Sequence, residues 1–208
     1  MKKMGGHTGI ILLALLLILA PMSMAKADSS QGPYVGIFGG LVLPSDLSAS
    51  DNTDSLDFDL DNSFMLGVKG GYIFPAFPYL AAEIEYNYMG EQDASFMSVN
   101  VGKVSLNNLF ANLIFRYPQG MFHPYIGAGI GWSWIKWDST GVGASAGLTD
   151  EDDNAWAWQF LVGINVSFDR NWSADLGYRY FSAENFKYRD VDIEYKASII
   201  TFGVNYHF

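Results

Sequence analysis

The sequence contains no cysteine and few charged side chains, and these two shortages exclude several classes of protein. Without cysteine, the 208-residue chain forms neither disulfides nor thiolate metal sites. Charged residues make up only 16% of it, below the roughly 25% usual in soluble domains. Lysine and arginine number 12 against 22 acidic residues, a formal net charge of -10, so no nucleic-acid partner is expected.

The chain also lacks an apolar run long enough for a membrane-spanning helix, which needs about 20 residues. Its longest run, 10–20, has 11 residues. Lys2 and Lys3 precede this run, and Ala25-Lys26-Ala27 follows it, which is the three-part pattern of a secretory signal peptide. We predict that 1–27 is a signal peptide cleaved after Ala27 and that 28–208 is the mature domain. A retained N-terminal anchor is the alternative.

The full chain instead contains 16% aromatic residues and 22 glycines. After residue 27, apolar and polar or small residues alternate with a period of two. In the last segment, Phe202, Val204 and Tyr206 lie on one face, and polar or small residues lie on the other. Such alternation predicts β-strands. Eight segments show it: 33–43, 63–74, 79–90, 101–117, 124–134, 156–168, 172–181 and 199–208.

The two faces of these strands predict which side meets lipid. One face is branched and aromatic, and the other carries mostly Gly, Ser, Asn, Glu and Arg. A chain without a spanning helix crosses a bilayer only as a closed barrel. We therefore predict an all-β fold, an eight-stranded antiparallel up-and-down transmembrane β-barrel with its apolar face toward lipid. A soluble lipocalin-like barrel is the alternative.

The connections between these segments alternate in length. The short ones near 75–78, 118–122 and 169–171 are expected to be periplasmic turns. The other four predict long extracellular loops: 44–62, 91–100, 138–154 and 182–192. Aromatic side chains near both strand ends predict membrane girdles, and all six tryptophans belong to them: Trp132, Trp134, Trp137, Trp156, Trp158 and Trp172.

Several segments resemble a known family. The end of the chain, with Phe202, Val204, Tyr206 and Phe208 at every second position, resembles the C-terminal signal of outer-membrane barrels. Tyr34–Gly40, His123–Gly131 and Ala174–Tyr180 look like strands of the opacity-protein and OmpA/OmpX-like superfamily of small barrels. The resemblance covers 34–208 and implies outer-membrane lipid and lipopolysaccharide as surroundings, and the barrel-assembly machinery as a partner.

Six charged side chains point into the predicted lumen by the same alternation: Lys69, Glu83, Glu85, Arg116, Asp175 and Arg179. Buried charges must be paired, so they predict a lumenal charge network. One reading of it is a structural plug of salt bridges. The other is an ion gate in which Lys69, Glu83 and Arg116 exchange partners.

The predicted loops 44–62 and 138–154 are acidic and contain no base, which predicts a solvated, repulsive surface. Asp57, Asp59 and Asp61 imitate the start of a calcium-binding loop. Asn62 and Val68 stand where that loop requires Gly and Glu, so these acids are weak metal candidates, and no cofactor is expected.

The mature chain has only two histidines, His123 and His207, both near the predicted periplasmic turns. A site acting on outer-leaflet lipid would need a histidine near the loops to activate a serine, so we expect no enzyme. The leading hypothesis is a structural or surface-interaction role, adhesin-like or opacity-like, with a possible extracellular ligand bound by the acidic loops. The alternative is a narrow channel or a conduit for ions or small hydrophobic molecules.

Overall fold

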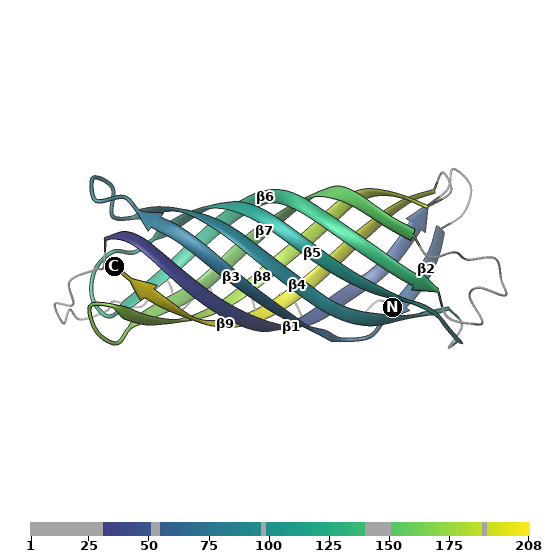
Figure 1. The fold of residues 1–208 in the computed structure, drawn as a ribbon, viewed down its shortest axis with the longest axis horizontal. Helices are drawn as coiled ribbons and strands as arrows, with labels where there is room; N and C mark the ends of the chain where they lie inside the picture. Colours follow the sequence, from purple (N-terminus) through teal and green to yellow (C-terminus); the bar gives the residue numbers. More distant parts are fainter. Residues whose placement is uncertain (1–30, 51–54, 97–98, 140–150, 189–190) are drawn as a thin grey trace, which may run out of the picture.

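The computed structural model describes residues 31–50, 55–96, 99–139, 151–188 and 191–208. The regular elements in these ranges are β-strands, tilted around a common axis (Figure 1). No helix in the described ranges is long and apolar enough to cross a membrane. The strands are β1 (Gly32–Ser50), β2 (Ser55–Leu60), β3 (Ser63–Ile73), β4 (Leu80–Phe96), β5 (Val99–Arg116), β6 (Phe122–Ser139), β7 (Glu151–Ser167), β8 (Trp172–Tyr188) and β9 (Val191–His207).

The strands form a closed antiparallel barrel with eight positions around its wall. Each strand from β3 to β9 pairs with the next in sequence, and β1 pairs with both β3 and β9, which closes the ring. The short β2 pairs with β1 and β4, the same two neighbours as β3. It therefore continues the line of β3 at the outer end, and the predicted eight-stranded barrel is confirmed.

The short connections lie at the end of the barrel that also holds the C-terminus (Figure 1). The turn after β7 is held by Asp169, whose Oδ1 accepts hydrogen bonds from the backbone N–H groups of Asn171 (2.7 Å) and Trp172 (2.8 Å). Gly120, in the turn before β6, has a φ of 82°, a conformation that favours glycine. We call this end of the barrel the inner end, because short turns face the periplasm in bacterial barrels.

At the opposite, outer end the strands run further than the sequence analysis predicts. β1 extends to Ser50 and β4 to Phe96, β5 begins at Val99 and β8 reaches Tyr188. Strands thus occupy much of 44–62, 91–100 and 182–192 and both ends of 138–154, and the loop lengths are not confirmed. The physical reason is that the outer ends of these strands carry runs of polar residues, such as Glu91-Gln92-Asp93, rather than an apolar residue at every second position. They therefore lose the alternation of hydrophobicity by which a half-buried strand is recognised.

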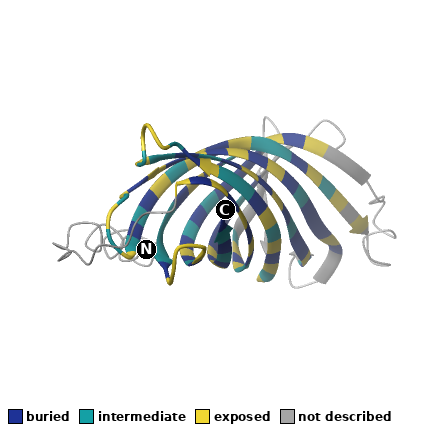
Figure 2. Ribbon diagram, turned by 60° about the vertical axis from the view of Figure 1, so that its left-hand side comes forward, coloured by how far each residue is buried: buried dark blue, intermediate teal, exposed yellow. Residues whose placement is uncertain are grey.

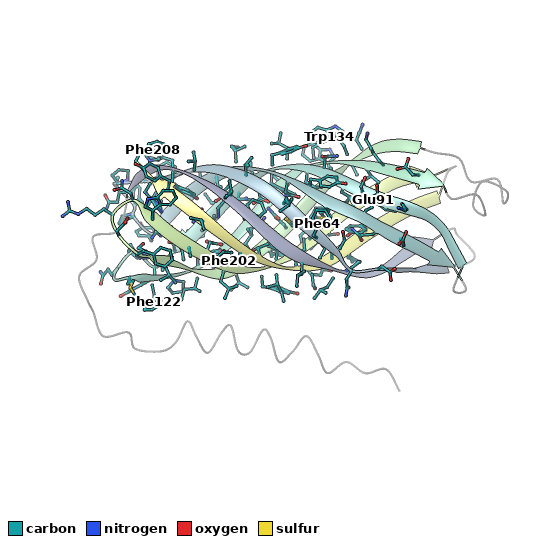
Figure 3. All side chains as sticks on the ribbon, turned by 60° about the horizontal axis from the view of Figure 1, so that its bottom comes forward. Phe64, Glu91, Phe122, Trp134, Phe202 and Phe208 are labelled. Carbon is teal, nitrogen blue, oxygen red and sulfur yellow. The ribbon has the colours of Figure 1, made fainter. Side chains whose placement is uncertain are left out.

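Burial along the strands confirms that the apolar face is outside. Ile84, Phe160 and Phe202 expose 58%, 58% and 60% of their surface on the outer wall. Their neighbours Glu83, Gln159 and Thr201 are buried inside. Figure 2 shows the resulting bands of buried and exposed residues, and Figure 3 shows Phe122 and Phe208 near the inner end and Trp134 toward the outer end. The wall therefore presents hydrocarbon and aromatic side chains to its surroundings.

The interior has two halves of different character, which corrects the expectation of a polar lumen throughout. The inner half holds buried charged side chains beside a smaller apolar cluster that includes Ile114 and Leu161. In the outer half Phe110, Phe181 and Tyr195 are buried and packed edge to face, with ring centroids 5.9 and 5.7 Å apart. The rest of this outer-lumen cluster consists of Phe38, Val42, Met65, Met89, Val104, Leu106, Ala155, Ala157, Ala183, Ala197 and Ile199.

Candidate functional site in the barrel interior

The polar half of the lumen is organised around Lys69. Its Nζ lies 3.5 Å from Glu83 Oε2 and 3.9 Å from Asp175 Oδ2, and all three side chains are at least nine-tenths buried. The short turn between β3 and β4 aligns Gly71 with Glu83 and Lys69 with Glu85. In this register Lys69 lies two residues along β3 from Gly71, the position opposite Glu83, which is the carboxylate that Lys69 contacts.

A second buried ion pair lies further toward the outer end. Arg179 donates from Nη1 to Glu85 Oε1, and its guanidinium carbon lies 4.5 Å from the centre of the Phe38 ring. Arg179 therefore contacts the ion network on one side and the outer-lumen cluster on the other. This layer marks the boundary between the polar and apolar halves of the lumen.

Tyrosine and asparagine side chains complete the network, and the sequence analysis missed them. Tyr34 donates to Glu83 Oε2 and Tyr125 donates to Asp175 Oδ1, each at 2.9 Å. Asn112 Nδ2 bridges the two glutamates, at 3.1 Å from Glu83 Oε1 and 3.2 Å from Glu85 Oε2. Strand parity alone places these residues inside, but it carries no signal for their pairing with residues 27 or more positions away in sequence.

Glycines opposite the two tyrosines make room for their rings. A Cβ on Gly71 would lie 2.3 Å from Tyr34 Cζ, and one on Gly163 would lie 2.6 Å from the Tyr125 hydroxyl. Both distances are below van der Waals contact. The Tyr34 and Tyr125 rings therefore fit in the narrow lumen only because glycine stands at the positions that they contact. A side chain at Gly71 or Gly163 would force the tyrosine into another rotamer.

Arg116 is the one predicted lumenal charge that lies apart from the network. Among the described residues, no carboxylate lies within 4 Å of its guanidinium. It lines a cavity of about 40 Å³ at the inner end, together with His123 and His207. The ion gate would require Arg116 to take over Glu83 from Lys69. In this structure Glu83 is paired with Lys69, and Arg116 makes no ion pair with it.

Both histidines are hydrogen-bonded to serines at the inner end. His123 Nε2 lies 3.2 Å from Ser167 Oγ, with Nδ1 3.0 Å from the Tyr117 carbonyl. His207 Nε2 lies 3.0 Å from Ser173 Oγ. The sequence analysis placed the histidines at this rim but did not anticipate the serine partners. Ser173 and His123 are fully buried, so these pairs satisfy internal hydrogen bonds.

The residues assigned to the membrane girdles face outward. Trp134 and Trp156 are 41% and 63% exposed near the outer end, and Trp172 is 48% exposed at the inner end. Trp132 and Trp156 pack edge to face, with centroids 4.8 Å apart. The side chain of Trp137 lies outside the described residues. Of the C-terminal signal, Phe202 and Phe208 are exposed on the outer wall and Val204 and Tyr206 are half-buried beside them.

The weak metal candidates lie at the outer end. The side chains of Asp57 and Asp59 fall outside the described residues, and Asp61 is exposed. Within the part of the chain that the structure describes, no group of three or more His, Asp or Glu side chains is arranged to hold a metal ion.

Comparisons with known proteins agree with this geometry. The model of the outer membrane protein beta-barrel domain family matches residues 11–208, and the chain belongs to this family of outer-membrane barrels. No match is found among curated proteins.

Solved structures of small outer-membrane barrels have the same fold. OprG from Pseudomonas aeruginosa is 14% identical with a TM-score of 0.65, covering 87% of this chain and 98% of its own. Neisserial surface protein A (NspA) is 20% identical with a TM-score of 0.58, covering 85% and 97%. The Escherichia coli outer membrane protein W is 20% identical with a TM-score of 0.53, covering 88% and 100%. At these identities the likeness concerns the fold, and this chain is an eight-stranded outer-membrane β-barrel.

Proposed function

We propose that this outer-membrane barrel is a structural, surface-interacting protein whose binding function lies in its outer hairpins. The observation that carries the proposal is the filled lumen. Phe110, Phe181 and Ile199 are fully buried in its outer half, and the ion network lies beneath them. A barrel closed in this way serves as a rigid support rather than as an open pore.

The outer hairpins offer the surface for such binding. Beyond the outer tryptophans, β6 continues to Ser139, and β4 continues past Met89 to Phe96. The described side chains there include the exposed acids Asp61, Glu91 and Asp138. The exposed pair of Glu91 and Lys103 has an Nζ–Oε2 distance of 2.8 Å. An acidic rim of this kind favours a basic partner or one bridged by divalent cations.

Neutralising the rim tests this proposal. The variant Asp61→Asn, Glu91→Gln, Asp138→Asn changes only exposed side chains. It is expected to keep the heat-modifiable electrophoretic mobility of a folded barrel and to lose binding of whole cells to a polylysine-coated surface and to host cells. A matched variant, Asp169→Asn with Arg170→Gln, alters charges at the inner end and should bind like the wild type. Unchanged binding by the neutralised rim would contradict the proposal.

A conduit for small hydrophobic molecules is the second candidate, because the outer half of the lumen is lined by apolar side chains. Movement of Phe38 and Phe181 away from the axis would open this half toward the outside. We expect no discrete conductance from the wild type in planar bilayers. In the double variant Phe38→Ala, Phe181→Ala we expect the conductance to increase. Uptake of an uncharged fluorescent dye into vesicles by the wild type would favour the conduit over the closed support.

A further inference from the structure

The small cavity at the inner end of the lumen has polar side chains that the ion network does not use. Ile73, Arg116 and His207 line it and are the last inward residues of their strands, so it lies next to the periplasmic mouth. Its volume is about 40 Å³, and a single water site needs about 10–15 Å³. The cavity therefore has room for a few non-hydrogen atoms.

Arg116 supplies unpaired donors to this cavity. It is 9% exposed, and among the described residues it lacks a carboxylate within 4 Å, as shown above. Lys69 also lines the cavity but is already paired with Glu83 and Asp175. A buried guanidinium that faces a cavity requires acceptors, and a carboxylate matches its forked geometry best.

Two amide oxygens supply unpaired acceptors to the same cavity. Asn165 and Asn205 both line it, and their Oδ1 atoms are buried without a hydrogen-bond partner. Their Nδ2 groups donate to Ser173 Oγ, at 2.9 and 3.3 Å. Ser173 has one hydroxyl hydrogen, shared with His207, so it cannot also serve both oxygens. Gly36 makes room for Asn205 Oδ1, since a Cβ there would lie 2.2 Å from it.

We propose that this cavity is a binding site for a small α-hydroxy or α-amino carboxylate that enters from the periplasmic side. The carboxylate accepts hydrogen bonds from Arg116. An adjacent ammonium donates to both Asn165 Oδ1 and Asn205 Oδ1, and an adjacent hydroxyl donates to one of them. A simple carboxylate would leave both oxygens unpaired, and a simple amine would leave Arg116 unpaired. The volume limits the part of the ligand inside the cavity to about the size of glycolate or glycine.

Solution NMR of the refolded, ¹⁵N-labelled barrel in detergent micelles tests the site with glycolate, glycine and acetate as probes. Glycolate and glycine are expected to shift the Arg116 Nε–H and Asn205 Nδ2–H signals saturably. Acetate lacks the second donor and should bind at least about tenfold more weakly, because a site built to hydrogen-bond a group discriminates against ligands that lack it.

Three variants separate the roles of the residues, with folding checked by heat-modifiable mobility. Arg116→Gln should abolish binding of all three probes, whereas Arg116→Lys retains the charge and should retain weakened binding. Asn205→Ala should erase the preference for glycolate over acetate without abolishing acetate binding. Arg170→Gln, on the exposed turn at 168–171, is the matched control and should bind like the wild type. Equal affinity for glycolate and acetate, or no saturable shift with any probe, would overturn the proposal.

Discussion

Removing the Glu85 carboxylate provides the sharpest test of the lumenal network. Glu85 is fully buried and accepts hydrogen bonds from Arg179, from Asn87 Nδ2 at 2.8 Å and from Asn112 Nδ2 at 3.2 Å. In Glu85→Ala the Arg179 guanidinium loses its paired carboxylate inside the barrel. Breaking a buried pair by removing one partner costs about 3–5 kcal/mol, and we expect a loss of unfolding free energy in this range.

The same chain offers a matched control on its surface. Glu91 and Lys103 form an ion pair with an Nζ–Oε2 distance of 2.8 Å, with side chains 57% and 46% exposed. Solvent screens exposed pairs, which contribute about 0–1 kcal/mol, so Glu91→Ala should change stability by no more than that. The double variant Glu85→Leu, Arg179→Leu should recover much of the loss, because it leaves no unpaired buried charge.

Reversible urea unfolding in lipid vesicles, followed by tryptophan fluorescence, measures these differences, and electrophoretic mobility reports the folded fraction independently. If Glu85→Ala loses no more stability than Glu91→Ala, then water reaches the lumenal pair and screens it. The interpretation of these charges as a dry structural network would then be wrong. A double variant as unstable as Glu85→Ala would instead assign the loss to Asn87 and Asn112.

Three further predictions test the packing, the assembly signal and the membrane contact. Gly67→Val should lose about 1–3 kcal/mol in the same urea assay, because a Cβ there would lie 2.3 Å from Phe38 Cζ; Gly70→Ala, whose nearest contact would be at 4.0 Å, should be tolerated. Deleting Phe208 should leave refolding in detergent unchanged but reduce the amount in the outer membrane of cells, as cell fractionation would show; normal insertion would refute the role of the terminal signal. In a variant that retains only Trp156, brominated lipids should quench its fluorescence strongly; unquenched emission would place this residue in water.

The sequence was sufficient for the wall of the barrel and for the identity of its inward charges. Regular alternation in segments such as 156–168 and 199–208 assigns each side chain to a face, because successive residues of a strand point to opposite sides. Alternation failed at the outer ends of the strands, where runs of polar residues such as Glu91-Gln92-Asp93 replace it. It also failed to indicate the apolar filling of the outer lumen, since inward Phe110 and Phe181 were read only as members of a polar face.

Pairing inside the lumen could not be obtained from the sequence. Tyr125 and Asp175 are 50 positions apart and meet only because the strands are tilted and closed into a ring. The position of Arg116 away from any carboxylate has the same origin, because its height in the lumen depends on the stagger of neighbouring strands.

The sequence by itself determined that this protein is a lipid-facing β-barrel, since a period of two with one apolar face has no other stable arrangement in a bilayer. The tertiary structure alone decided which side chains fill its lumen, which ions are paired within it and where a small cavity remains. The physical reason is that facing a lumen is a local property of a strand, whereas contact across the lumen depends on the closure and tilt of the whole sheet.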